Sequence, residues 1–162
     1  MYKGSRFKLL VVTLVLLLFN VPFPVRFTQN AIELSLDDPE VEIKRELTVS
    51  GWYHLNLFKA DSFIGTIAAE GYEMTNQPFD EPVYCRKSKS SRIVYNSEAE
   101  EIHFGIFWAD RFLRHIIVGI KEQHTNGAST FSFHTGRYIV GGVYDRASAV
   151  DQLRPISIIS LS

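Results

Sequence analysis

Residues 41–57 read VEIKRELTVSGWYHLNL, and apolar side chains recur at every second position of this stretch. The even positions from 42 to 50 are charged or hydroxylated. A period of two is typical of a β-strand with one buried and one exposed face. Arg45 interrupts the apolar face, and Gly51 predicts a bulge or bend. We therefore expect a half-buried strand whose core face carries Val41, Ile43, Leu47, Val49, Tyr53, Leu55 and Leu57.

Further stretches with strand character follow at 63–74, 81–85, 93–95, 101–108, 112–121 and 131–140. Asn126-Gly127 is the strongest hairpin signal, and the alternation that leads to Trp108 predicts that this side chain is buried. Asp145 is expected to cap a short helix that ends at Pro155, before a last strand over 156–161. The chain is thus predicted to be mainly β, as an antiparallel sandwich or partly open barrel with one short C-terminal helix.

The N-terminal segment has the pattern of a membrane anchor. Residues 9–19 read LLVVTLVLLLF and follow Lys3, Arg6 and Lys8, and a basic stretch before an apolar one indicates export or membrane insertion. Residues 9–25 reach the lower limit of length for a spanning helix. The nearest candidate cleavage site ends at Ala31 and has Gln29 where a small residue is needed. We expect an uncleaved signal-anchor transmembrane helix, with secretion after cleavage as the alternative.

This anchor predicts a single-pass protein of the cell membrane, with a cytoplasmic N-terminus and an extracytoplasmic domain, because positive charge stays inside. The expected organisation is an anchor or signal segment over 1–25, a juxtamembrane linker over 26–40 and a β-rich domain over 41–162. The chain of 162 residues has a net charge of −1, but its first thirty residues hold four basic and no acidic side chains. The acidic remainder disfavours nucleic acid as a partner. Cys85 is the sole cysteine, so no intrachain disulfide can form.

Two blocks of sequence carry a resemblance to known proteins. Residues 51–67, GWYHLNLFKADSFIGTI, and residues 107–111, FWADR, resemble segments of uncharacterised small membrane-anchored proteins of Bacillus-type bacteria. The resemblance implies a compartment and a class of host, and it implies no activity.

His103 and His115 are the candidate metal ligands. If the strands 101–108 and 112–120 pair around Asp110, so that partner numbers sum to about 220, both histidines lie on one face as a diagonal pair. Zinc takes three or four ligands, which His54 or Glu101 could complete. The alternative is a pair of ordinary strand histidines.

Arg86, Lys87, Lys89 and Arg92 form a basic loop that could contact anionic lipid headgroups or cell-wall polyanions, or could be a solvated hairpin tip. The sequence has no nucleophile elbow, phosphate loop or zinc-protease motif. We therefore expect no catalytic residues and no cofactor, and a binding or interaction domain tethered to the membrane through residues 9–25. The alternative function is a small cell-surface enzyme or metal-binding domain that uses the histidine-bearing face. A third hypothesis is a regulator that contacts a membrane protein partner through the basic loop.

Overall fold

The computed structural model describes residues 3–19, 21–86, 89–96, 101–123 and 129–159. Strand β2 (Glu42–His54) confirms the alternation from Leu47 onward, because Leu47, Val49 and Tyr53 are all fully buried. Ile43, which was predicted to lie on the same core face, is 37% exposed. The strand ends at His54, so Leu57 leaves the sheet and is half-exposed. At Gly51, β2 passes so close to β3 (Asp61–Ala69) that a Cβ would lie 2.7 Å from the Cα of Gly65.

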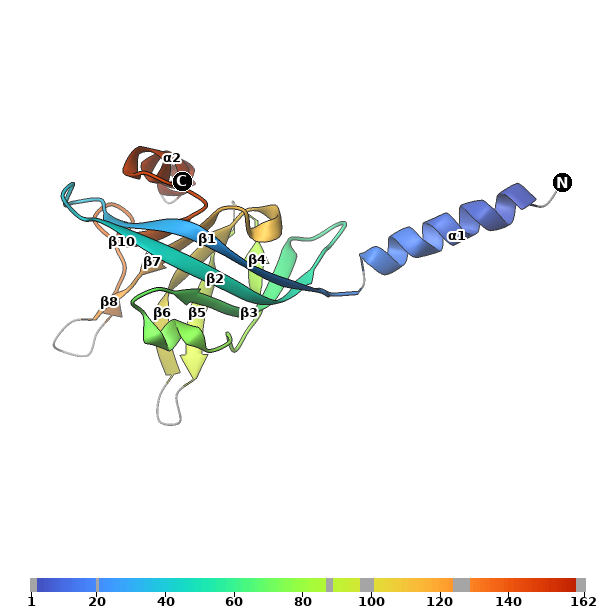
Figure 1. Cartoon of the computed structure of the whole chain (residues 1–162), viewed down its shortest axis with the longest axis horizontal. Helices are drawn as coiled ribbons and strands as arrows, with labels where there is room; N and C mark the ends of the chain where they lie inside the picture. Colours follow the sequence, from blue (N-terminus) through green and yellow to red (C-terminus); the bar gives the residue numbers. More distant parts are fainter. Residues whose placement is uncertain (1–2, 20, 87–88, 97–100, 124–128, 160–162) are drawn as a thin grey trace.

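The other strands of the main sheet are β1 (Phe23–Ser35), β4 (Val83–Cys85), β5 (Ser91–Asn96), β6 (Glu101–Ala109), β7 (Ile116–Ile120) and β10 (Arg137–Gly141). Eight strands form an antiparallel sheet in the order β4-β3-β2-β1-β10-β7-β6-β5. The sheet curls into a nearly closed barrel, which is the second of the two predicted architectures (Figure 1). The amide of Tyr84 donates a hydrogen bond of 2.9 Å to Ser91 Oγ across the seam between β4 and β5.

A two-stranded ladder of β8 (Glu122–Gln123) and β9 (Ser129–Thr130) follows β7 in the chain. The predicted turn at Asn126-Gly127 lies between these two strands and outside the described residues.

The barrel interior is filled with side chains. Phe79, which follows the 3-10 helix η1 (Glu73–Asn76), lies with its ring centroid 5.9 Å from that of Tyr95 and 6.3 Å from that of Phe63. Eight-stranded barrels are just wide enough for side chains to fill them or to hold one small ligand. Here the interior is packed with aromatic rings, so a ligand site is to be sought at the ends of the barrel or on its outside.

A second core lies outside the barrel, under helix α2 (Arg146–Ile159). Asp145 caps this helix as predicted, since its Oδ1 accepts a hydrogen bond of 2.8 Å from the amide of Ser148. The predicted stop at Pro155 and the predicted strand after it are wrong, because the helix continues to Ile159. Burial of Ile156 against the sheet compensates for the backbone hydrogen bond that Pro155 cannot make.

A β-bulge divides the apolar face predicted for β6. Ile93 pairs with Gly105 but Val94 pairs with His103, so Phe104 has no partner and the alternation shifts there. Phe104 therefore points into the barrel core, whereas Trp108 lies in the outer core under α2. Trp108 is 6% exposed, which confirms the prediction that it is buried.

The predicted linker over 26–40 is wrong, because β1 occupies Phe23–Ser35 and pairs with both β2 and β10. Phe23, Val25 and Phe27 do alternate with more exposed residues, but Pro24 lies among them. A proline is tolerated near the start of a strand, and here it does not end the ladder. The β-rich domain thus begins at Phe23, and residues 23–25 of the predicted anchor belong to β1.

Helix α1 (Lys3–Leu18) extends away from the barrel (Figure 1). Its described apolar side chains are exposed, among them Phe7 and Leu9 at 69% and Leu10 at 64%. No helix in the described part of the chain is long and apolar enough to cross a membrane.

One end of the barrel, which we call the base, is the end at which β1 stops and β2 begins. Glu33 is fully buried there and binds Arg45 Nε at 2.9 Å and Arg137 Nη2 at 2.7 Å. The hydroxyl of Tyr72 donates a further hydrogen bond of 2.9 Å to Glu33. Burial, followed by the nearby Glu33 carboxylate, raises the pKa of Tyr72 to about 12. The buried charge is thus fully paired.

Candidate functional site

The opposite end of the barrel, which we call the mouth, is formed by three loops. These are the β2–β3 loop (55–60), the β4–β5 loop (86–90, of which 86 and 89–90 are described) and the β6–β7 loop (110–115). Helix α1 leaves the barrel on the same side, because β1 begins at Phe23 opposite Tyr53 at the end of β2 (Figure 1).

Asp61 lies at the floor of the mouth and is only 1% exposed. Its carboxylate accepts hydrogen bonds of 2.8 Å from the Tyr53 hydroxyl and from the amide of Asn56, and it binds Arg111 Nε at 2.9 Å. A buried carboxylate is stable only when it is paired in this way. Burial, more than these contacts, raises the pKa of the Tyr53 hydroxyl well above its usual value. Asp61 therefore acts as an anchor that holds Arg111 at the mouth.

The β6–β7 loop has an uncommon backbone, because Phe112 (φ 66°) and Leu113 (φ 57°) both adopt left-handed conformations. Bulky residues rarely do so, and such strain is found where the surrounding contacts impose it. Here Asp110 accepts a hydrogen bond of 2.9 Å from the amide of His115, and Leu113 is fully buried. The loop is therefore fixed.

The Phe112 ring is held from below. It stacks on Tyr53 at a centroid distance of 5.7 Å, and its amide donates a hydrogen bond of 3.0 Å to the Tyr53 hydroxyl. The ring is nevertheless 50% exposed. The strained loop thus presents an aromatic ring and the Arg111 guanidinium side by side.

A cavity of about 360 Å³ opens at the mouth. Its rim carries the cations of Lys59, Arg86 and Arg111. Each acidic group beside them already has a partner, because Asp61 forms an ion pair with Arg111 and Asp110 is hydrogen-bonded to His115 Nδ1 at 2.9 Å. The full lining is Leu57, Phe58, Lys59, Ala60, Asp61, Cys85, Arg86, Asp110 and Arg111. The arrangement suits an anionic ligand with an apolar part.

Cys85 is the only thiol in this cavity and is not activated. It is 3% exposed, and burial, followed by the charges of Asp61 and Asp110, raises its pKa to about 12. The thiolate is the nucleophilic form, so a neutral buried thiol indicates a structural role. The mouth therefore has the chemistry of a binding site more than that of a covalent catalyst.

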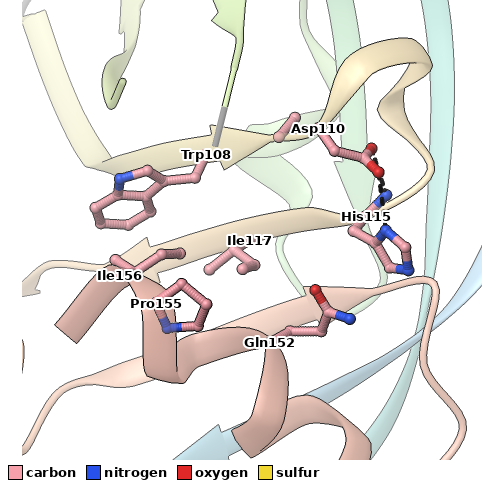
Figure 2. A pocket seen from close by; sticks show the side chains of 8 residues that line it. Trp108, Asp110, His115, Ile117, Gln152, Pro155 and Ile156 are labelled. Atoms are coloured by element: carbon pink, nitrogen blue, oxygen red, sulfur yellow. Dashed lines mark hydrogen bonds and ion pairs between the residues drawn. The ribbon is translucent and has the colours of Figure 1, made fainter. Parts of the chain in front are cut away.

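A second, much smaller hollow of about 10 Å³ lies between α2 and the sheet. Figure 2 shows His115 and Gln152 on one side of it and Trp108 and Ile156 on the other, with His115 hydrogen-bonded to Asp110. Its volume corresponds to about one water molecule. The hollow and the mouth share Asp110, so both depend on the β6–β7 loop.

The structure does not bring the two predicted metal ligands together. Partner numbers on β6 and β7 sum to 225, as in Ala109 with Ile116, because a six-residue loop replaces the tight turn that was assumed. His115 therefore lies at the mouth, whereas His103 pairs with Val94 toward the other end of β6. No cluster of three or more metal-binding side chains occurs among the residues that the structure describes.

The predicted basic loop is divided among three environments. Arg86 lines the mouth cavity, and the ammonium of Lys89 lies 3.8 Å from the centroid of the Tyr84 ring. Arg92 is an exposed residue of β5, and Lys87 lies outside the described residues. Of the three described residues of this loop, only Arg86 thus lines the cavity.

Sequence reasoning missed Lys59, Asp61 and Arg111 as parts of one site. The ion pair between Asp61 and Arg111 joins the segments 51–67 and 107–111, and no local pattern in either segment indicates that they meet. Comparisons with models of protein families, with curated proteins and with solved structures find no match for the chain. The geometry of the mouth therefore carries the functional argument.

Proposed function

We propose that this protein is a binding module tethered to a membrane by α1, and that its mouth binds an anionic ligand. The observation that carries the proposal is an open cavity whose rim carries Lys59 and Arg86, in addition to Arg111, which is paired with the Asp61 carboxylate on the floor. The cations of the lining outnumber its carboxylates, and such an excess of positive charge attracts anions, because the cavity walls reduce the screening by solvent.

The exposed apolar side chains of α1 support the tether. Phe7, Leu9 and Leu14 are between 55% and 69% exposed, and an apolar helix surface of this kind is stable only when another apolar phase covers it. The basic residues that precede the apolar stretch favour a cytoplasmic N-terminus and an extracytoplasmic barrel. Cleavage near Ala31 would remove most of the ladder between β1 and β2, which supports an uncleaved helix.

The tether is tested on the full chain in cells. We expect it to stay in the membrane fraction after washing with carbonate, and a reporter fused after Ser162 to be active only outside the cytoplasm. A mature chain that begins near Ala31, or a reporter active in the cytoplasm, would contradict the proposal.

The binding site is tested with glycerol phosphate, which shares its chemistry with phosphatidylglycerol headgroups and with wall polymers. We expect amide shifts confined to the mouth in an NMR titration of the full chain in a non-ionic detergent at low salt. The double variant Lys59→Gln/Arg86→Gln should weaken binding at least tenfold. Lys44→Gln, which neutralises an exposed cation far from the mouth, is the matched control and should bind as the unmodified chain does. Equal binding by the two variants would refute the assignment of the site.

A specific observation also favours the second function, a small cell-surface enzyme. Asp110 holds His115 by its Nδ1 at 2.9 Å, which is the arrangement that orients a histidine general base. His115 lines a hollow that can hold a water molecule (Figure 2). The test is hydrolysis of a panel of p-nitrophenyl esters by the full chain. An activity that His115→Gln abolishes would favour the enzyme, and no activity, or one that the variant retains, would dismiss it.

A further inference from the structure

We propose that the mouth docks on the outer leaflet of the membrane that holds α1, with Phe58 and Leu57 inserted at the boundary between headgroups and acyl chains. This inference rests on the proposed tether, and it names the lipid headgroup as the anionic group at the mouth.

The short connection from α1 to β1 limits the distance between the mouth and a membrane that holds α1. Only residues 19–22 separate Leu18, the last residue of α1, from Phe23, the first residue of β1. A fully extended chain spans about 18 Å between those two positions. Phe23 pairs with Tyr53, and the β2–β3 loop begins two residues after Tyr53. A membrane that holds α1 is therefore close to the mouth and far from the base (Figure 1).

The loops of the mouth carry apolar side chains that are exposed and do not pack in the barrel core. Phe58 is 97% exposed at the tip of its loop, and Leu57 is 47% exposed beside it. Phe112 is 50% exposed on a different loop of the same end. Apolar side chains that converge from separate loops indicate a surface that is covered in the working protein.

The outward face of the barrel continues this apolar surface. Trp52 and Ile64 are cross-strand partners on β2 and β3, and Trp52 lies two residues before the end of β2 at the mouth. Their side chains are 54% and 40% exposed. Tryptophan is enriched at the interface between membrane and water, where one part of its ring system is apolar and the other is wet. The insertion surface therefore has an apolar tip and an interfacial flank.

The charge of the mouth fits an anionic leaflet. In its described loops, Lys59, Arg86 and Lys89 are exposed cations. Arg111 and Arg114 are exposed as well, but their charges offset those of Asp61 and Asp110. The two acidic residues at this end, Asp61 and Asp110, are buried and paired with basic groups. Basic side chains next to a bilayer gain from the negative surface potential, and this gain adds to apolar insertion.

The base has the opposite character. The β1–β2 turn there exposes Asp37, Asp38 and Glu40, and the segment after β3 exposes Glu70 and Glu73. An anionic leaflet would repel these carboxylates. The charge distribution thus orients the barrel with its mouth toward the lipid and its base toward water.

A single label tests the insertion. Phe58→Cys is labelled with the fluorophore NBD in the full chain, since Cys85 is buried with a raised pKa and reacts slowly. Glu40→Cys at the base is the matched control, because both positions are exposed and their replacement does not disturb the core. The chains are reconstituted in vesicles of phosphatidylcholine and phosphatidylglycerol and are quenched by nitroxide lipids.

We expect the label at 58 to emit at shorter wavelength and to be quenched at least twofold more than the label at 40. Vesicles of phosphatidylcholine alone should reduce this difference, because the cations then lose their partners. Chains that float with the vesicles but have equally aqueous labels at 58 and 40 would overturn the docking and leave the tether standing. Chains that fail to float would overturn the tether and the docking together. A label at 58 that is equally deep in both kinds of vesicle would overturn the part assigned to the cations.

Discussion

The Tyr53 hydroxyl connects the two halves of the mouth. It donates to Asp61 at 2.8 Å and accepts from the Phe112 amide at 3.0 Å. We predict that Tyr53→Phe lowers the free energy of unfolding of the full chain by about 1–3 kcal/mol, because the buried Asp61 carboxylate and the part-buried Phe112 amide each lose a partner. Urea unfolding in a non-ionic detergent measures the loss. Tyr84→Phe removes a hydroxyl from a half-exposed ring and should cost less than about 0.5 kcal/mol. Equal losses in the two variants would show that the hydroxyl of Tyr53 is not a structural link.

The two tryptophans of the chain form a second matched pair. Trp108 is 6% exposed and its ring centroid lies 6.1 Å from that of Phe133, whereas Trp52 is 54% exposed. We predict that Trp108→Ala lowers the free energy of unfolding by about 3–5 kcal/mol, because it opens a cavity between α2 and the sheet. Trp52→Ala should cost far less, and a larger loss from Trp52→Ala than from Trp108→Ala would contradict the assignment of the outer core.

At the level of elements, two variants of the β6–β7 loop separate the cost of backbone strain at Phe112 from the loss of its aromatic ring. Phe112→Gly and Phe112→Ala both remove the ring, but only glycine adopts a φ of 66° without a steric cost. We predict that the glycine variant is the more stable of the two by about 1 kcal/mol, which is the reverse of the order in a helix or strand. Thermal unfolding of both variants checks the order. A more stable alanine variant would mean that the loop relaxes out of its left-handed conformation.

The sequence predicted those elements whose pattern is local. The alternation in β2 from Leu47 to Tyr53 and the cap at Asp145 were confirmed because each depends on neighbours in the chain. The bulge at Phe104 was missed, since a shift in pairing depends on the partner strand β5. Strand β1 was missed because residues 26–40 were assigned to a linker, whereas the ladders with β2 and β10, which hold this segment in the sheet, depend on strands far away in the chain.

The candidate site could be predicted only in part, for a similar reason. Arg86 was found from a run of basic residues. The contact between Asp61 and Arg111 joins positions fifty residues apart, and it forms only because the barrel brings the β2–β3 and β6–β7 loops to one end. The predicted pair of His103 and His115 required a register that the length of the β6–β7 loop changes.

At the level of the whole molecule, the ionisable side chains buried in the barrel core and in the outer core under α2 predict sensitivity to alkali. Burial raises the pKa of Tyr138 and of Cys85 to about 12 each, and that of Tyr95 further. Groups with a raised pKa in the folded state ionise first in the unfolded chain, so their contribution is intact below the unfolded pKa and is lost as pH rises above it. We expect stability to decline from about pH 9–10 upward, and Tyr95→Phe to make the decline less steep. Urea midpoints between pH 7 and 11 test this, and a flat profile would contradict it.

Because β4 and β5 form no ladder with each other, the chain can be divided between them into two fragments that each keep their own strand pairings. Strands β1 to β4 form one continuous meander, and β5, β6, β7 and β10 form the other, with the ladder of β1 and β10 as the sheet pairing that joins them. A cut between β4 and β5 in the chain separates two consecutive sets of four strands of the main sheet without interrupting a ladder of that sheet. We expect the two fragments, when produced together, to reassemble into the barrel by fragment complementation, and the far-ultraviolet spectrum of the purified pair to match that of the intact chain. A cut within the β2–β3 loop should complement poorly, because it divides two paired strands of one meander. The evolutionary consequence is modularity: the molecule has the form of two half-barrels, and insertions at their junction would leave both halves intact.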